Sequence, residues 1–135
     1  GAYRNFELNQ MDLAGRPGRA FYLEEEGVPA YDELIIVAKS DNTGNPQISL
    51  FLAAIEAATQ FMINHQDEAW ELFIKGRKDL DDELNRRAWR DTLPRFALRP
   101  SALDEGRYQR FAEFLKARGM IETIPPVESY AVEVR

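Results

Sequence analysis

The sequence has 135 residues, of which 44% are hydrophobic and 30% are charged, and these values predict about one globular domain and exclude a disordered chain. The formal net charge of −6 argues against a nucleic-acid partner, because proteins that bind phosphate backbones need a basic surface. The absence of cysteine excludes a disulfide framework, a cysteine-ligated metal site and a thiol nucleophile.

We also expect neither a membrane-spanning helix nor a signal peptide in this sequence. No apolar run approaches the roughly 20 residues that a transmembrane helix needs. Residues 1–8 lack the apolar core that is typical of a signal peptide. If the parent protein is exported, its signal would lie upstream of this chain.

The first segment, residues 3–8, alternates in the way that is typical of a strand. On such a strand Tyr3, Asn5 and Glu7 share one face, while the residues between them face a core. A second short strand is predicted at residues 20–23.

The clearest predicted strand is Glu33–Ala38. Its apolar residues do not alternate with polar ones, which indicates burial on both faces, as in the middle of a parallel sheet. We therefore expect Leu34–Val37 to be covered on both sides. Exposure of this segment would contradict that interpretation.

Four helices are predicted between residues 46 and 121. The first begins at Pro46 with Asn45 as its cap, the second begins near Asp67, and the third begins near Asp82. Pro94 should end the third helix. Ser101 should cap the start of the fourth helix, and Gly119 should follow its end.

The sequence thus predicts an α/β chain of two or three strands followed by about four helices. Residues 1–40 would be rich in strands, residues 46–121 helical, and residues 122–135 an extended tail with a possible edge strand after residue 127. Parallel strands need crossover helices between them, and no helix separates these strands. We therefore expect either part of a larger fold or a homodimer that exchanges Tyr3–Ala38.

Four blocks of the sequence resemble substrate-binding proteins of ABC importers for thiamine pyrimidine precursors, a thiamine-biosynthesis family. The first block, residues 1–7, reads Gly-Ala-Tyr-Arg-Asn-Phe-Glu. The other blocks are residues 25–34, residues 80–89 and residues 92–97. Each block is weak alone, but together they span nearly the whole chain.

The resemblance implies the C-terminal part of a type II periplasmic binding protein fold, in which ligand lies in a cleft between two α/β lobes. Residues 34–38 would then be a strand that crosses towards a missing N-terminal lobe. The implied function is capture of a hydroxymethylpyrimidine-type precursor and its delivery to a membrane permease. The implied location is periplasmic, or extracellular at the membrane, with no catalysis and no cofactor.

The resemblance also suggests ligand-binding residues. A carboxylate such as that of Glu7 can accept a hydrogen bond from the amine of an aminopyrimidine, the Asn5 amide can donate and accept, and the Tyr3 ring can stack. The alternative is that the same three residues form the solvent-facing side of a strand. Because three residues on one wall supply too little free energy for micromolar affinity, we expect the chain alone to bind pyrimidines weakly or not at all.

Three other functions remain open. The same family includes a eukaryotic pyrimidine synthase, but that enzyme relies on a histidine and a cysteine cluster. Related importers carry sulfonates, nitrate or taurine. A free-standing helical interaction domain is the third alternative.

The remaining candidate residues favour structural roles. His65, the only histidine, lies between two predicted helices and fits a loop or capping position better than a catalytic base. No metal-ligand spacing is present, and the consecutive acids 81–83 point in different directions on a helix. Trp70 and Trp89 lie on apolar helix faces and are predicted to be core residues.

Overall fold

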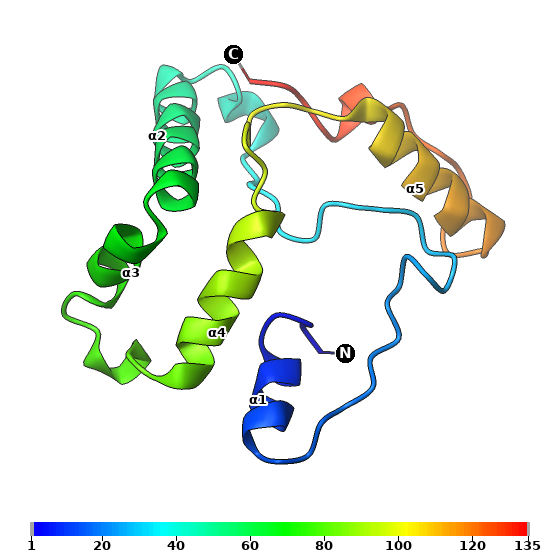
Figure 1. Ribbon diagram of the computed structural model, residues 1–135. Coiled ribbons are helices and arrows are strands. Elements are labelled where there is room, and N and C mark those ends of the chain that lie inside the picture. Colours follow the sequence, from blue (N-terminus) through cyan, green and yellow to red (C-terminus); the bar gives the residue numbers. More distant parts are fainter. Residues whose placement is uncertain (1, 135) are drawn as a thin grey trace. The chain divides into compact units, whose positions relative to one another are not determined.

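The computed structural model describes residues 2–134, and these residues are helical or irregular (Figure 1). They divide into two compact units, each of which is described by itself. Unit 1 contains the residues up to Ala20 together with Ala54–Pro100, and unit 2 contains Phe21–Ala53 together with the residues from Ser101 onward. The division therefore falls inside a helix, α2 (Pro46–Asn64).

The predicted α/β fold class is wrong, because no strand occurs among residues 2–134. Residues 3–8 turn into the helix α1 (Glu7–Leu13), and residues 20–23 and 33–38 form no ladder. In the tail, the 3₁₀ turn η4 (Val127–Ser129) replaces the start of the expected edge strand. A strand persists only where a second extended segment satisfies its backbone groups, and the described residues supply no such pair.

Local hydrogen bonds explain why the first segment is a helical turn. The Tyr3 carbonyl accepts from the N–H of Phe6 at 3.1 Å and from the N–H of Glu7 at 3.0 Å. These bonds satisfy backbone groups within the chain segment itself, so alternation of polar and apolar residues is not enough to extend it.

The apolar segment Leu34–Val37 is exposed rather than buried. Leu34 and Val37 are 87% and 78% exposed, and Ile35 and Ile36 are 58% and 51% exposed. The prediction that this segment is a strand buried on both faces, crossing towards another lobe, is therefore wrong. Its continuous apolar pattern indicates a surface that a partner could cover, but the pattern does not make a strand.

Unit 1 combines a helix from the start of the chain with helices from its middle. It contains α1, the second half of α2, and four further elements: α3 (Gln66–Ile74), η2 (Lys78–Leu80), α4 (Glu83–Thr92) and η3 (Leu93–Arg95). The helix α1 packs against α4, as Figure 1 shows. The core of unit 1 includes Trp70 and Leu93, each 2% exposed.

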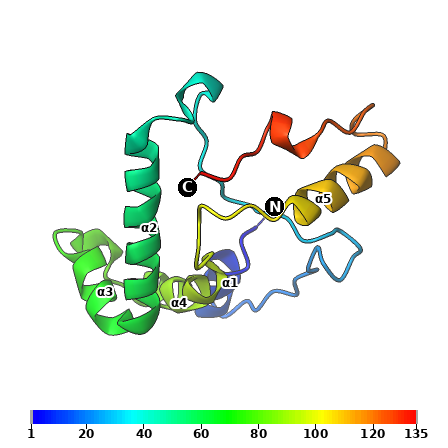
Figure 2. The ribbon, with the colours of Figure 1, turned by 90° about the horizontal axis from the view of Figure 1, so that it is seen from above.

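Unit 2 combines a long irregular segment, residues 21–39, with the helix α5 and the first half of α2. Its elements are η1 (Ser40–Asn42), the first half of α2, α5 (Glu105–Ala117) and η4. The turn η4 lies beside α5 in both ribbon views (Figure 2). The buried residues of unit 2 include Ala112 and Val127, each 7% exposed.

Most of the expected helix boundaries are confirmed. The N–H of Gln47 donates to Asn45 Oδ1 at 2.9 Å, as expected for an asparagine cap before Pro46. The third predicted helix, α4, begins after Asp82, which accepts from Asn85 N–H at 2.7 Å. A 3₁₀ turn that contains Pro94 follows its end.

The boundaries of α5 confirm one expectation and correct another. The cap is Asp104, which accepts from Arg107 N–H at 2.9 Å, so Ser101 was the wrong residue. A carboxylate directly before the helix binds the free N–H groups of the first turn and complements the helix dipole. Gly119 follows the helix with φ +70°, a conformation that favours glycine and ends helices.

The helix α2 has the length and composition of a membrane span, contrary to the expectation from sequence. It has 19 residues with a mean hydropathy of 1.2, and 11% of it is buried. Core helices of globular proteins share these two properties, so α2 carries no membrane assignment by itself.

Candidate functional site

The three predicted ligand-binding residues lie at the start of α1, on a turn instead of a strand. The backbone N–H of Tyr3 donates to Glu7 Oε2 at 2.7 Å. This bond brings the Tyr3 backbone and the Glu7 side chain together on one turn, and Tyr3 remains 52% exposed. Asn5 lies on the same turn, but its side-chain amide nitrogen is bound to Thr92 of α4.

Asn5 ties α1 to α4. Its Nδ2 donates to Thr92 Oγ1 at 2.6 Å, and the Thr92 hydroxyl in turn donates to the Ala88 carbonyl at 2.6 Å. Both groups are partly buried, where a hydrogen bond is harder for water to replace. The contact fixes the plane of the Asn5 amide and positions the turn that carries Tyr3 and Glu7.

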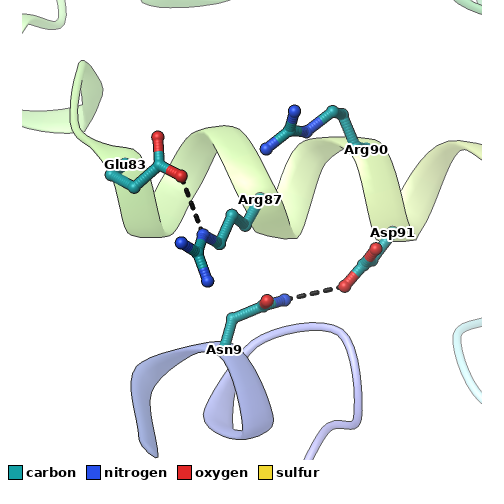
Figure 3. A pocket seen from close by; sticks show the side chains of 5 residues that line it. All are labelled: Asn9, Glu83, Arg87, Arg90 and Asp91. Carbon is teal, nitrogen blue, oxygen red and sulfur yellow. Dashed lines mark hydrogen bonds and ion pairs between the residues drawn. The ribbon is translucent and has the colours of Figure 1, made fainter. Parts of the chain in front are cut away.

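A polar hollow of about 430 Å³ lies between α1 and α4. Figure 3 shows the five residues that line it: Asn9, Glu83, Arg87, Arg90 and Asp91. Asn9 Nδ2 donates to Asp91 Oδ2 at 2.7 Å across the two helices. The hollow therefore contains two carboxylates and two guanidinium groups, so its charges are balanced.

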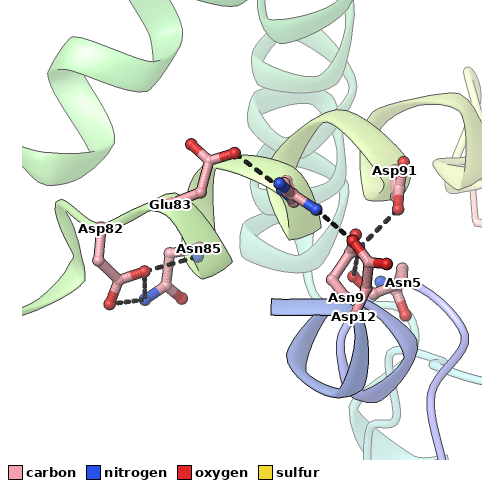
Figure 4. Close-up of polar contacts among 8 residues, drawn as sticks. Asn5, Asn9, Asp12, Asp82, Glu83, Asn85 and Asp91 are labelled. Atoms are coloured by element: carbon pink, nitrogen blue, oxygen red, sulfur yellow. Dashed lines mark hydrogen bonds and ion pairs between the residues drawn. The ribbon is translucent and has the colours of Figure 1, made fainter. Parts of the chain in front are cut away.

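Arg87 is the central ion-pair partner beside this hollow. Its Nε donates to Glu83 Oε1 at 2.7 Å, and its Nη1 donates to Asp12 Oδ2 at 2.7 Å (Figure 4). The hydrogen bond to Arg87 holds the pKa of Glu83 below its ordinary value, because it favours the ionised carboxylate. Because Arg87 is paired with two carboxylates, it stabilises the contact between α1 and α4 and is not free to bind an anion.

The sequence reading missed Asn9 and the role of Arg87. The Arg87 side chain is only 31% exposed. The spacing of Glu83 and Arg87 was a usable signal, because residues four apart on a helix are neighbours. No sequence pattern signalled the contact to Asp12, which is 75 residues away in the chain.

An aromatic cluster packs around the buried Trp70 of unit 1. The ring centroids of Trp70 and Trp89 are 5.6 Å apart in an edge-on arrangement, and Phe73 lies 5.2 Å from Trp89. The Arg86 guanidinium lies 4.8 Å from the Trp70 ring. The prediction of a core residue is confirmed for Trp70, while Trp89 is partly buried.

His65 occupies the N-cap position of α3 without a side-chain capping bond. Its ring stacks on Phe61, with centroids 4.9 Å apart. Within the described part of the chain, no group of three or more histidine, aspartate and glutamate side chains could hold a metal ion.

Unit 2 contains a second, larger cavity of about 700 Å³. Its aromatic walls come from α5 and from the segments on either side of it: Tyr31, Tyr108, Phe111 and Tyr130. Arg107 lines the same cavity and forms an ion pair with Asp32. Sequence reasoning missed this cavity because the apolar positions of α5 have the spacing of an ordinary core stripe.

Comparison with known proteins supplies the family. The chain matches the family model described as NMT1/THI5 like over residues 1–69. It is 46% identical over 135 residues to a protein of Haemophilus influenzae named "Putative thiamine biosynthesis protein". That alignment covers 99% of this chain and 43% of the relative, so the chain spans less than half of the relative's length. No solved structure matches the chain. The chain belongs to the NMT1/THI5-like family, as its resemblance predicted.

Proposed function

We propose that this chain is part of a binding protein that captures a hydroxymethylpyrimidine-type thiamine precursor without making or breaking a bond. Family membership and the name of the Haemophilus influenzae relative support a role connected with thiamine. The observation that carries the proposal is the turn at the start of α1, where the Glu7 carboxylate accepts from the backbone N–H of Tyr3 and Tyr3 remains exposed.

The chemistry of these two residues suits an aminopyrimidine. The ionised Glu7 carboxylate accepts hydrogen bonds only, so it fits the exocyclic amine of the ligand. The Tyr3 ring offers a flat apolar face for stacking. Asn5 would present its amide oxygen in a fixed orientation, because its nitrogen is bound to Thr92.

Magnitudes limit what these residues achieve alone. A hydrogen bond to a charged group contributes about 1.5–3 kcal/mol, whereas micromolar affinity needs about 8 kcal/mol. Association also has an entropic cost. We therefore expect the 135-residue chain to bind the pyrimidine more weakly than the polypeptide of the complete gene.

Calorimetric titration with 4-amino-5-hydroxymethyl-2-methylpyrimidine tests this function. The polypeptide of the complete gene should bind it at micromolar or tighter affinity, and Glu7→Gln should weaken binding at least tenfold. Glu68→Gln is the matched control, because Glu68 also lies in the first turn of a unit 1 helix, and it should change affinity less than twofold. Preference for a sulfonate, nitrate or taurine would overturn the pyrimidine assignment and support the other importer class.

The alternative is an enzyme of the pyrimidine-synthase type, since the relative is named for thiamine biosynthesis and not for transport. The chain contains no cysteine and one histidine, and the histidine ring stacks on Phe61. Incubation of the complete gene product with iron and pyridoxal phosphate separates the two functions. Formation of a pyrimidine product would overturn the non-enzymatic proposal.

We further propose that the protein works with an ABC permease, in the periplasm or outside the cell at the membrane. Cells that express the permease should take up labelled pyrimidine only when the binding protein is present. Uptake that is unchanged by deletion of the binding protein would contradict this partnership.

A second copy of the chain is a further proposed partner. The support is the exposed apolar segment Leu34–Val37, because contiguous apolar surface commonly marks an interface. Light scattering should give a dimer mass, which Leu34→Lys with Val37→Lys should reduce towards a monomer. Leu72→Lys replaces a leucine that is 57% exposed in unit 1 and should leave the dimer intact. A monomeric unmodified chain would overturn the proposal.

A further inference from the structure

We propose that the cavity of unit 2 is a binding site for a planar aromatic cation. This inference does not depend on the proposed pyrimidine function, because its residues belong to unit 2 and Tyr3 and Glu7 belong to unit 1. Three properties of the cavity carry the inference: its size, the ring faces that line it, and the balance of charge among its side chains.

The size of the cavity suits a small organic molecule. Its volume of about 700 Å³ lies within the range of about 300–1,000 Å³ that is usual for ligand pockets. Its lining is mainly aromatic and aliphatic, with a few polar groups. That composition is typical of sites where apolar walls hold a ligand and a few polar groups orient it.

The walls provide flat ring surfaces. Tyr31 stacks on Phe111 with centroids 4.9 Å apart and an interplanar angle of 24°. Tyr108 and Tyr130 form a second, tilted pair at 6.1 Å. Tyr31 and Tyr130 remain 37% and 49% exposed, so their ring surfaces are incompletely used by packing within the unit. A flat aromatic ligand can cover them by offset or edge contacts.

The charges favour a cation over an anion. Two carboxylates, Asp32 and Glu122, and one guanidinium, Arg107, line the cavity. Arg107 is paired with Asp32 and lies 3.7 Å from the Asp104 carboxylate, and the two negative charges and one positive charge of the lining leave a net charge of −1. The faces of tyrosine and phenylalanine rings also attract cations.

The direction in which the pKa of Tyr108 is shifted agrees with this charge balance. Burial raises the pKa of Tyr108, and the negative charge of Asp32 raises it further. Both effects disfavour an additional negative charge at this position. The negative charge of Asp32 would likewise disfavour an anionic ligand such as a phosphate ester and would attract an aromatic amidinium.

Three probes of nearly equal size test the charge preference: benzamidinium, benzoate and benzyl alcohol. Titration of the 135-residue chain, followed by NMR of the tyrosine ring signals, reports affinity and location together. Benzamidinium should bind at least tenfold more tightly than benzoate, with benzyl alcohol between them, and should shift the signals of Tyr31, Tyr108 and Tyr130. Equal affinities, or shifts confined to other tyrosines, would overturn the proposal.

Two variants remove one negative charge each. Asp32→Asn should weaken benzamidinium binding about threefold to fivefold and strengthen benzoate binding, because it also releases Arg107. Glu122→Gln leaves that ion pair in place and should weaken benzamidinium binding about twofold. Asp41→Asn alters an exposed aspartate of η1 in the same unit and is the matched control with no expected effect.

The remaining outcomes separate this site from the pyrimidine site. Glu7→Gln should leave benzamidinium binding unchanged, so a failure of the pyrimidine assignment leaves the cavity proposal standing. If both carboxylate variants bind benzamidinium as the unmodified chain does, while their helix content by circular dichroism is unchanged, charge does not select the ligand and the proposal is wrong.

Discussion

The two units use aromatic side chains in opposite ways. In unit 1, Trp70, Phe73 and Trp89 pack against one another, and the Trp70 side chain is almost completely buried. In unit 2, Tyr31 and Tyr130 surround an open cavity and keep more than a third of their surface exposed. The aromatic rings thus bury Trp70 in unit 1, although Phe73 beside it is 48% exposed, whereas in unit 2 they line a cavity.

The residue types account for part of this difference. The hydroxyl of a tyrosine needs a hydrogen-bond partner or water, so a tyrosine favours positions where one end of the ring is wet. The indole N–H groups of Trp70 and Trp89 are buried and form no hydrogen bond with the described part of the chain. The comparison identifies unit 1 as the better packed scaffold and unit 2 as the better candidate for a small-molecule site.

The largest expected effect is the loss of the Trp70 ring. Trp70→Ala should lower the free energy of unfolding by about 3–5 kcal/mol, because it leaves a cavity among Phe73 and Trp89. Urea unfolding followed by circular dichroism measures this loss.

Two variants control for the Trp70 result. Trp70→Phe keeps an aromatic ring and removes an unpaired N–H, so it should cost much less than alanine. Leu72→Ala changes an exposed residue of the same helix and should stay within about 0.5 kcal/mol. If Leu72→Ala and Trp70→Ala lower the free energy of unfolding by similar amounts, Trp70 is not the centre of a packed core in unit 1.

The matching change in unit 2 is Phe111→Ala. Phe111 is only partly buried and faces the cavity, so its removal enlarges an existing space and should cost about 1–2 kcal/mol. The same unfolding measurement applies. A loss as large as that of Trp70→Ala would show that Phe111 belongs to a closed core and would weaken the cavity interpretation.

The aspartate caps allow a direct comparison, since each unit has one at the start of a helix. Asp82→Ala in unit 1 and Asp104→Ala in unit 2 each remove a carboxylate that binds a backbone N–H, at 2.7 and 2.9 Å. Each change should cost about 1 kcal/mol, measured by thermal unfolding. An effect of Asp104→Ala near zero would indicate that α5 is held by its packing and not by its cap.

The smallest expected effect is the pH dependence of the Glu83–Arg87 pair. Because the folded-state pKa of Glu83 is lowered from 4.5, its contribution to stability is present above that value and is lost as the pH falls through the folded-state pKa. Glu83→Gln should therefore reduce stability slightly at pH 7 and make no difference at strongly acidic pH. A difference that grows on acidification would contradict the sign of this coupling.

The sequence by itself determined the family, the helices after residue 45 and most of their boundaries. Those features depend on local chemistry: Asn45 caps α2, Pro94 follows the end of α4, and the left-handed Gly119 terminates α5. Amphipathic spacing also identified Trp70 as a core residue. Each of these signals lies within a few residues of the structure that it specifies.

Only the tertiary structure decided the conformation of residues 3–8, the exposure of residues 34–37 and the location of the cavities. Residues 3–8 could pair as a strand or close a local turn, and the choice depended on hydrogen-bond partners that the sequence does not specify. The contacts from Asn5 to Thr92 and from Asp32 to Arg107 join residues more than 70 positions apart. Local propensity carries no information about such pairs, because they form only when separate elements are packed together.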